Sequence, residues 1–179
     1  AYTWFNRLMA IRIMQKNGFI SPILAYESEI VHIPHIVAEA RRGILPTMTE
    51  DNRRALLEYM EDDNKVTEQF TYLIIAFCQF NPVLKACFGN VNDYTELLLP
   101  KNILAEGGFI DLLNHTNFIS DEDYCSPELI GWLYQFYISE KKDEVFASFK
   151  KSKKAEAEDI PAATQIFTPN WIVKYMVQN

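Results

Sequence analysis

The chain has 179 residues, of which 49% are hydrophobic and 13% aromatic, and its formal net charge is −7. That apolar content is enough for a packed core and excludes a globally disordered chain, while the acidic balance argues against an autonomous nucleic-acid clamp. Only 6 glycines and few runs of β-branched residues predict helices rather than sheets.

The N-terminal half predicts a series of short helices. Apolar residues recur at helical spacing over 2–17, 33–42, 49–60 and 66–80. Gly18 and Gly43 follow the first two of these segments and are typical helix stops. Thr49 is a suitable cap for the third segment. The fourth has little polar face, so we expect it to be the most buried helix, ended by Asn81-Pro82.

The second half predicts shorter helices and then a long one. A short helix is expected to open at Asn92 or Asp93 and to end at Pro100, and Gly107-Gly108 forms a hinge before another apolar turn or two over 109–113. Ser126-Pro127-Glu128 combines a capping residue with a proline at the first helical turn. It predicts a long helix with a buried face made of Leu129, Ile130, Leu133, Phe136 and Tyr137.

Charged residues divide the chain after this helix. The pattern turns polar from Ser139, and 150–159 has the character of an exposed linker. We therefore predict an all-α, irregular multi-helix domain over 1–150, a linker over 151–160, and the start of a second domain over 161–179.

The last segment predicts a helix that needs a partner. Thr168 can cap it and Pro169 fits its first turn. Apolar residues then share one face: Trp171, Ile172, Tyr175 and Met176. A helix of about ten residues is marginal alone in water. The chain is therefore expected to be a fragment of a larger protein. Ala1 lies inside an amphipathic pattern, so we expect the fragment to be cut at its N-terminus as well.

Candidate metal, phosphate and redox sites are weak in this sequence. His32 and His35 are three positions apart with no carboxylate or cysteine expected at ligand spacing, and His115 stands alone, so we predict no metal site. Gly107-Gly108 lacks the strand and third glycine of a phosphate loop. The 3 cysteines have no C-x-x-C spacing, which argues against zinc and a disulfide framework and suits a reducing cytoplasm. Cys78 is expected to be a small core residue.

A lysine-rich stretch leaves two interpretations open. Lys150, Lys151, Lys153 and Lys154 could contact a phosphate backbone, or they could form a solvated helix end and linker, which is the commoner outcome for charge runs. No apolar run approaches the roughly 18 residues of a membrane span, and no signal peptide is visible, so we expect a cytoplasmic protein without a membrane partner.

Two segments carry a family resemblance. Gly131-Trp-Leu-Tyr-Gln-Phe-Tyr-Ile-Ser-Glu-Lys-Lys-Asp-Glu-Val-Phe146 and Pro161-Ala-Ala-Thr-Gln-Ile-Phe-Thr-Pro-Asn-Trp-Ile-Val-Lys-Tyr-Met176 closely resemble the PglX-type adenine-specific DNA methyltransferases of bacterial phage-defence (BREX) systems. These proteins are related to methylase subunits of type II restriction enzymes. The opening segment, 2–18, is similar to the same family, and 23–125 matches it in general character only.

The resemblance implies a role for the terminal segment. In such methyltransferases the Thr-Pro segment, motif X, opens the α/β catalytic domain beside the S-adenosylmethionine site. It implicates Phe167, Thr168 and Pro169 in cofactor binding, where free amides at a helix start would favour the cofactor's carboxylate. The alternative to cofactor binding is that this segment is a capped helix whose only role is to pack against the rest of the protein. The downstream catalytic motifs are absent, and Asn81-Pro82-Val83-Leu84 lacks the second proline and the aromatic of the N/D-P-P-Y/F loop.

The resemblance therefore implies that the chain is the helical fragment upstream of the catalytic domain of an S-adenosylmethionine-dependent N6-adenine DNA methyltransferase. The complete protein would be an enzyme that flips adenine out of double-stranded DNA. The fragment would be a scaffold, without catalytic residues and inactive alone, with the missing methyltransferase domain and other defence-system proteins as partners. The alternative is a helical protein–protein docking module. Exposed Trp132 or Tyr134 in a flat apolar patch would favour docking, and a concave lysine-bearing face near the C-terminus would favour DNA binding. Whether the complete protein also cleaves DNA is left open.

Overall fold

The computed structural model describes residues 2–91, 99–115, 119–126, 128–150, 157, 159–164 and 168–179. The regular structure in these ranges is helical, apart from a single isolated antiparallel bridge between Tyr26 and Pro34. Contacts divide the chain into two compact units, 1–121 and 122–179. The helical domain predicted over 1–150 therefore spans both units.

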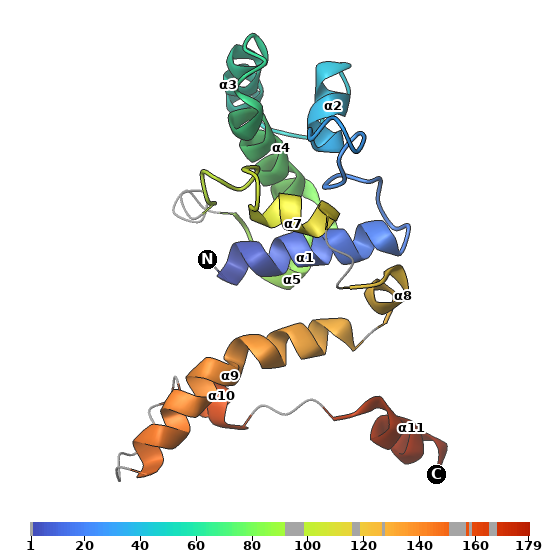
Figure 1. The fold of residues 1–179 in the computed structure, drawn as a ribbon, viewed down its shortest axis with the longest axis vertical. Coiled ribbons are helices and arrows are strands. Elements are labelled where there is room, and N and C mark those ends of the chain that lie inside the picture. Colours follow the sequence, from blue (N-terminus) through green and yellow to red (C-terminus); the bar gives the residue numbers. More distant parts are fainter. Residues whose placement is uncertain are drawn as a thin grey trace. The chain divides into compact units, whose positions relative to one another are not determined.

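The first unit contains most of the helices (Figure 1). They are α1 (Tyr2–Lys16), α2 (His35–Arg41), α3 (Glu50–Met60), α4 (Val66–Phe80), α5 (Pro82–Phe88) and α7 (Phe109–His115). The predictions over 2–17, 33–42, 49–60, 66–80 and 109–113 are confirmed. The helix expected to open at Asn92 or Asp93 lies outside the described residues.

Helix α4 is the centre of the first unit. Helices α2, α3 and α5 each pack against it, and its buried residues include Phe70, Leu73, Ile74 and Cys78. These side chains join a core to which α1 contributes Trp4, Leu8 and Ile11. Burying large side chains of this kind stabilises the fold by roughly 1.5–3 kcal/mol each before entropy is counted. The prediction that 66–80 is the most buried helix and that Cys78 belongs to the core is thus confirmed.

Local chemistry explains where these helices begin and end. Thr49 accepts a hydrogen bond from the amide of Asn52 at 3.3 Å, which caps α3 as predicted. Gly43 follows α2 with a φ of 87°, a left-handed conformation that glycine adopts without strain. Asn81 both ends α4 and opens α5, because its side-chain oxygen accepts from the amides of Val83 and Leu84 at 3.0 and 3.1 Å. Helix α5 was not predicted, although Pro82 at its first turn is the same start signal used elsewhere.

Buried polar side chains connect the helices of the first unit. Gln69 is fully buried and its amide nitrogen donates to the carbonyls of Tyr59 and Asp62 at 2.8 and 3.0 Å. Its oxygen accepts from Arg41 Nε and Nη2 at 3.1 and 3.0 Å. Gln69 therefore joins α2, the end of α3 and α4 through the hydrogen bonds of its buried side chain.

The short helix α8 (Asp121–Tyr124) precedes the second unit's remaining helices α9 (Leu129–Lys150), α10 (Ile160–Thr164) and α11 (Asn170–Gln178). Helix α10 packs on α9, where Lys141 Nζ lies 3.4 Å from Asp159 Oδ1. The long helix and the terminal helix were both predicted, whereas α10 was not. In the described ranges no single helix has the length and apolarity to cross a bilayer; only α4 and α5 taken together reach that length and composition, and they are bent by 81°.

Candidate functional site

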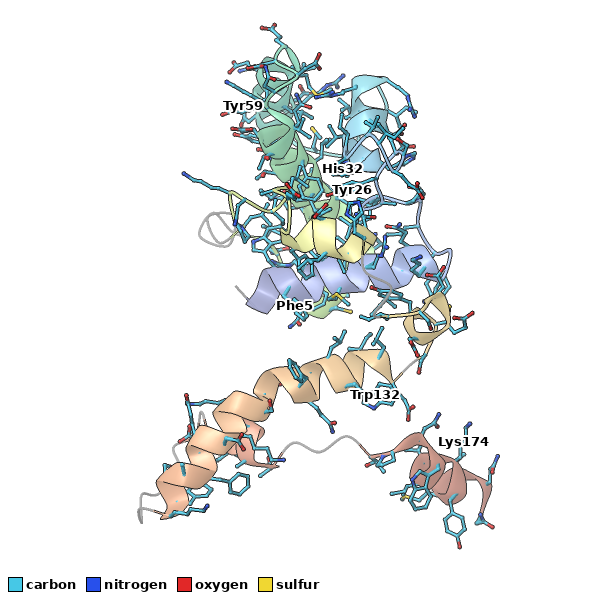
Figure 2. The ribbon with its side chains drawn as sticks, viewed as in Figure 1. Phe5, Tyr26, His32, Tyr59, Trp132 and Lys174 are labelled. Carbon is cyan, nitrogen blue, oxygen red and sulfur yellow. The ribbon has the colours of Figure 1, made fainter. Side chains whose placement is uncertain are left out.

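A pocket of about 800 Å³ lies between the first turns of α9 and of α11 in the second unit. This volume is within the usual range for a small-molecule site. Its lining includes Glu128, Trp132, Thr168, Pro169 and Trp171. Figure 2 shows the Trp132 side chain near the start of α9. Two of the three residues that the resemblance implicated in cofactor binding thus line a pocket.

Helix α9 brings one wall of this pocket into place. Ser126 Oγ accepts a hydrogen bond from the amide of Glu128 at 3.3 Å, which confirms the predicted helix start. Leu129 is buried as expected. The rest of the predicted buried face is wrong in part, because Ile130 is 58% exposed and Phe136 is 83% exposed. An apolar helix face is buried only where a neighbouring element covers it. Helix α10 packs on the C-terminal half of α9, where Val145 is buried, and does not cover Ile130 and Phe136.

Helix α11 provides the facing wall, and its start differs from the expected one. Pro169 is the cap residue, with a φ of −53° and a ψ of 141°, and it makes no side-chain cap. The capping group is instead Glu128, whose Oε1 accepts a hydrogen bond from the amide of Asn170 at 2.9 Å. A carboxylate at a helix N-terminus is favourable because it satisfies a free amide and faces the positive end of the helix dipole.

This cap changes the electrostatics expected for the pocket. The free amides at the start of α11 were predicted to favour an anionic group of a ligand. Since Glu128 already binds the Asn170 amide, its negative charge opposes a second carboxylate there and attracts a cation instead. The indole rings of Trp132 and Trp171 also line the pocket, and aromatic faces attract cations. The pocket is therefore suited to an apolar or aromatic ligand that carries positive charge.

The predicted site residues are distributed unevenly. Thr168 and Pro169 are exposed and line the pocket, whereas Phe167 lies outside the described residues. Lys150 is exposed at the end of α9, and Lys151, Lys153 and Lys154 lie outside the described residues. Glu128, Trp132 and Trp171 were not predicted as cofactor-site residues. No local pattern joins them, because Glu128 and Asn170 are 42 positions apart in the sequence.

The histidines are arranged differently from the expectation. His32 and His35 do not form a pair: His35 Nδ1 lies 3.1 Å from Glu27 and its Nε2 lies 3.4 Å from Glu39. Glu39 is one turn along the same helix, so the expectation of no carboxylate at ligand spacing was wrong. His115 was expected to stand alone, but its Nδ1 lies 2.9 Å from Asp111 Oδ1 on the same face of α7.

Comparison with known proteins places the whole chain within longer sequences. It is 41% identical over 189 aligned residues to the adenine-specific methyltransferase BrxX of Escherichia coli O9:H4 (strain HS). It is 35% identical over 192 aligned residues to the adenine-specific methyltransferase PglX of Lacticaseibacillus casei (strain Zhang). Each alignment covers 100% of this chain but only 14% and 15% of the respective relatives. No protein-family model and no solved structure matches the chain.

Proposed function

Because the whole chain is homologous to one segment of the PglX-type adenine-specific methyltransferases, we propose that it is a non-catalytic helical part of such an enzyme. The complete protein would transfer a methyl group from S-adenosylmethionine to adenine N6 in double-stranded DNA, as part of a phage-defence or restriction–modification system. The observation that carries this proposal is the similarity along the full chain, because both alignments extend over the Thr168-Pro169 segment.

The terminal helix supports a scaffolding role. Trp171 is 71% exposed and Met176 is 73% exposed, and α11 has no buried residue. An apolar face of this kind is stable when another element covers it. In our proposal the catalytic domain of the methyltransferase covers α11, so this chain connects that domain to the helices of the first unit.

The pocket supports a contribution to the cofactor site. S-adenosylmethionine carries a positive sulfonium and ammonium as well as a carboxylate, and it has an aromatic adenine ring. The Glu128 carboxylate would attract its cationic groups and the two indoles would accept the sulfonium or the adenine ring. Thr168 Oγ can donate to or accept from the cofactor's polar end. The remaining cofactor contacts would come from the catalytic domain.

A methyl-transfer assay tests the scaffold part of this proposal. The chain alone and the complete methyltransferase are each incubated with DNA and S-adenosylmethionine that carries a radiolabelled methyl group. We expect incorporation into DNA by the complete enzyme and none by the chain alone. Methyl transfer by the chain alone would contradict the proposal.

A matched pair of threonine variants tests the cofactor contact. In the complete enzyme, Thr168→Val is expected to raise the KM for S-adenosylmethionine by about tenfold, the effect of losing one hydrogen bond of roughly 1.4 kcal/mol. Thr164→Val is the control, because Thr164 Oγ bonds only its own helix, at Ile160 O 2.7 Å away. An unchanged KM for Thr168→Val would show that Thr168 does not contact the cofactor and that α11 serves only in packing.

A docking module is the second candidate function. Trp132 is exposed, as are Ile130 and Phe136 on the same helix, and exposure of Trp132 is one part of the pattern expected to favour docking. In the complete enzyme, Phe136→Ser would then weaken association with a purified protein of the same defence system while methyl transfer stays unchanged. If Phe136→Ser instead abolishes methyl transfer and leaves association normal, α9 packs against another domain of the same enzyme rather than against a partner protein.

We also propose that the lysine stretch 150–154 contacts DNA. Of its lysines, only Lys150 lies within the described residues. Charge reversal at Lys150, Lys151, Lys153 and Lys154 should weaken DNA retention uniformly across sequences, with a strong dependence on salt. Unchanged retention at low salt would assign these lysines to the solvated end of α9.

A further inference from the structure

Residues from two separate parts of the first unit form a cluster of metal-binding side chains. His32 lies in the loop 27–33, and Asp111 and His115 lie one turn apart on α7. Each offers one ligand atom, and the three atoms lie within 4.8 Å of one another. The chain has only 3 histidines, and two of them meet here beside a carboxylate.

The loop that carries His32 is held in place by its own base. The bridge between Tyr26 and Pro34 closes it, with hydrogen bonds from His35 N to Ala25 O at 2.8 Å and from Glu27 N to Ile33 O at 3.1 Å. The Tyr26 ring stacks on the His32 ring with centroids 5.1 Å apart and an interplanar angle of 8°, and Figure 2 shows the two rings side by side. This stacking orients the imidazole towards α7, where its centroid lies 4.9 Å from that of His115.

Each imidazole has a nitrogen that can bind an ion beside Asp111. His32 Nε2 lies 3.1 Å from the carbonyl oxygen of Glu29. A carbonyl only accepts, so this nitrogen carries the proton and Nδ1 keeps its lone pair. His115 Nδ1 lies 3.1 Å from the carbonyl oxygen and 2.9 Å from a carboxylate oxygen of Asp111. An ion bound to both residues would replace the proton that Nδ1 donates, and Nε2 would carry the proton instead. Metal-binding histidines typically donate through their second nitrogen, as His32 Nε2 does.

Hydrogen bonds hold the Asp111 carboxylate in place. Gly107 N donates to its Oδ2 at 2.9 Å and Tyr26 OH donates to its Oδ1 at 3.3 Å. The side chain is 14% exposed. These two donors use about two of the roughly four acceptor positions of a carboxylate, which leaves positions for a metal ion.

We propose that His32, Asp111 and His115 bind a divalent transition-metal ion of the zinc class and thereby tie the loop 27–33 to α7. Two imidazoles and one carboxylate form a common zinc ligand set, and imidazole nitrogen disfavours magnesium and calcium. Ligands about 2.1 Å from zinc lie about 3.4 Å apart in a tetrahedron, and the three ligand atoms here already lie within 4.8 Å of one another. Water completes the coordination, since His32 and His115 are exposed. This proposal is independent of the methyltransferase function and departs from the expectation of no metal site.

The test is titration of the purified chain with Zn²⁺ by calorimetry and with Co²⁺ by visible absorption. We expect saturable binding of about one ion per chain, and binding at least about tenfold weaker in His32→Ala and in His115→Ala. Both replaced side chains are exposed, so the variants are expected to fold, and circular dichroism checks this. Zn²⁺ should also raise the thermal midpoint of the unmodified chain and not that of the two variants.

Two controls separate this site from other ligands. His35→Gln removes the third histidine, whose two nitrogens face Glu27 and Glu39 separately, and it should leave the affinity unchanged. Cys87 and Cys125 are exposed thiols, and their joint replacement by serine should also leave it unchanged. Absence of saturable Zn²⁺ binding, undiminished binding in the His32 and His115 variants, or loss of binding in either control would overturn the proposal.

Discussion

The carboxylate of Glu128 accepts a hydrogen bond from the backbone amide of Asn170 at 2.9 Å, so the residue before α9 caps the start of α11. This contact places Thr168 and Trp171 opposite Trp132 across one pocket. A side chain three positions before the segment 131–146 therefore contacts the terminal segment, and these two segments carry the family resemblance.

Removal of the Glu128 cap should loosen the start of α11. Glu128→Ala deletes a charge-assisted hydrogen bond and its interaction with the helix dipole, together about 1–2 kcal/mol. Amide hydrogen exchange at Asn170 is expected to accelerate by about tenfold or more. Glu144→Ala is the matched control, because Glu144 is an exposed residue in the middle of α9 and its loss should leave exchange at Asn170 unchanged. Equal exchange in both variants would show that Glu128 does not hold α11.

Replacement of Gln69 should destabilise the first unit strongly. Gln69→Leu keeps the approximate volume but leaves the carbonyls of Tyr59 and Asp62 and the guanidinium of Arg41 without this partner. Unsatisfied buried groups cost about 1–3 kcal/mol each, so we expect a loss of about 2–4 kcal/mol in urea denaturation. Gln135→Leu, at a half-buried position of α9, should change stability by less than about 0.5 kcal/mol. An effect for Gln69→Leu no larger than that of Gln135→Leu would contradict the role of Gln69 in joining these helices.

The three cysteines should differ in reactivity. Burial raises the pKa of the Cys78 thiol to about 12, whereas Cys87 and Cys125 are exposed. A thiolate is the reactive form, so a maleimide or disulfide reagent at neutral pH should modify two thiols quickly. Cys78 should react only as fast as the core opens, and quickly once denaturant is added. Rapid modification of all three thiols in the native chain would contradict the buried position of α4.

Acid should weaken the link between α1 and the start of α8. The hydrogen bond from Lys16 lowers the pKa of Asp121 most, helped by the positive charges of Lys16 and Arg12 and opposed by desolvation. A carboxyl group with a lowered folded-state pKa stabilises the protein above its ordinary pKa of about 3.8, and that contribution is lost as the pH falls through the folded value. Asp121→Asn should therefore flatten the fall of the thermal midpoint below about pH 4. Asp143→Asn, at an exposed position of α9, should leave the profile unchanged.

Secondary structure was largely predictable because its signals are local. Thr49, Ser126 and Gly43 each act within a few residues of themselves, and apolar spacing marks the helices between them. The exceptions follow from the same rule. Helix α5 begins directly after Asn81, which had been interpreted only as the end of α4, and one residue performs both functions.

The sequence by itself determined the helical class, the positions of α1, α3, α4, α9 and α11, and the resemblance to adenine-specific methyltransferases. The tertiary structure decided which helix faces are covered, because burial depends on neighbours that no local pattern specifies: Leu129 is buried while Ile130 and Phe136 are exposed. It also decided which distant side chains meet. Glu128 reaches Asn170, and His32 meets Asp111 and His115, since contacts between separate segments arise only when the chain folds and brings their side chains within reach.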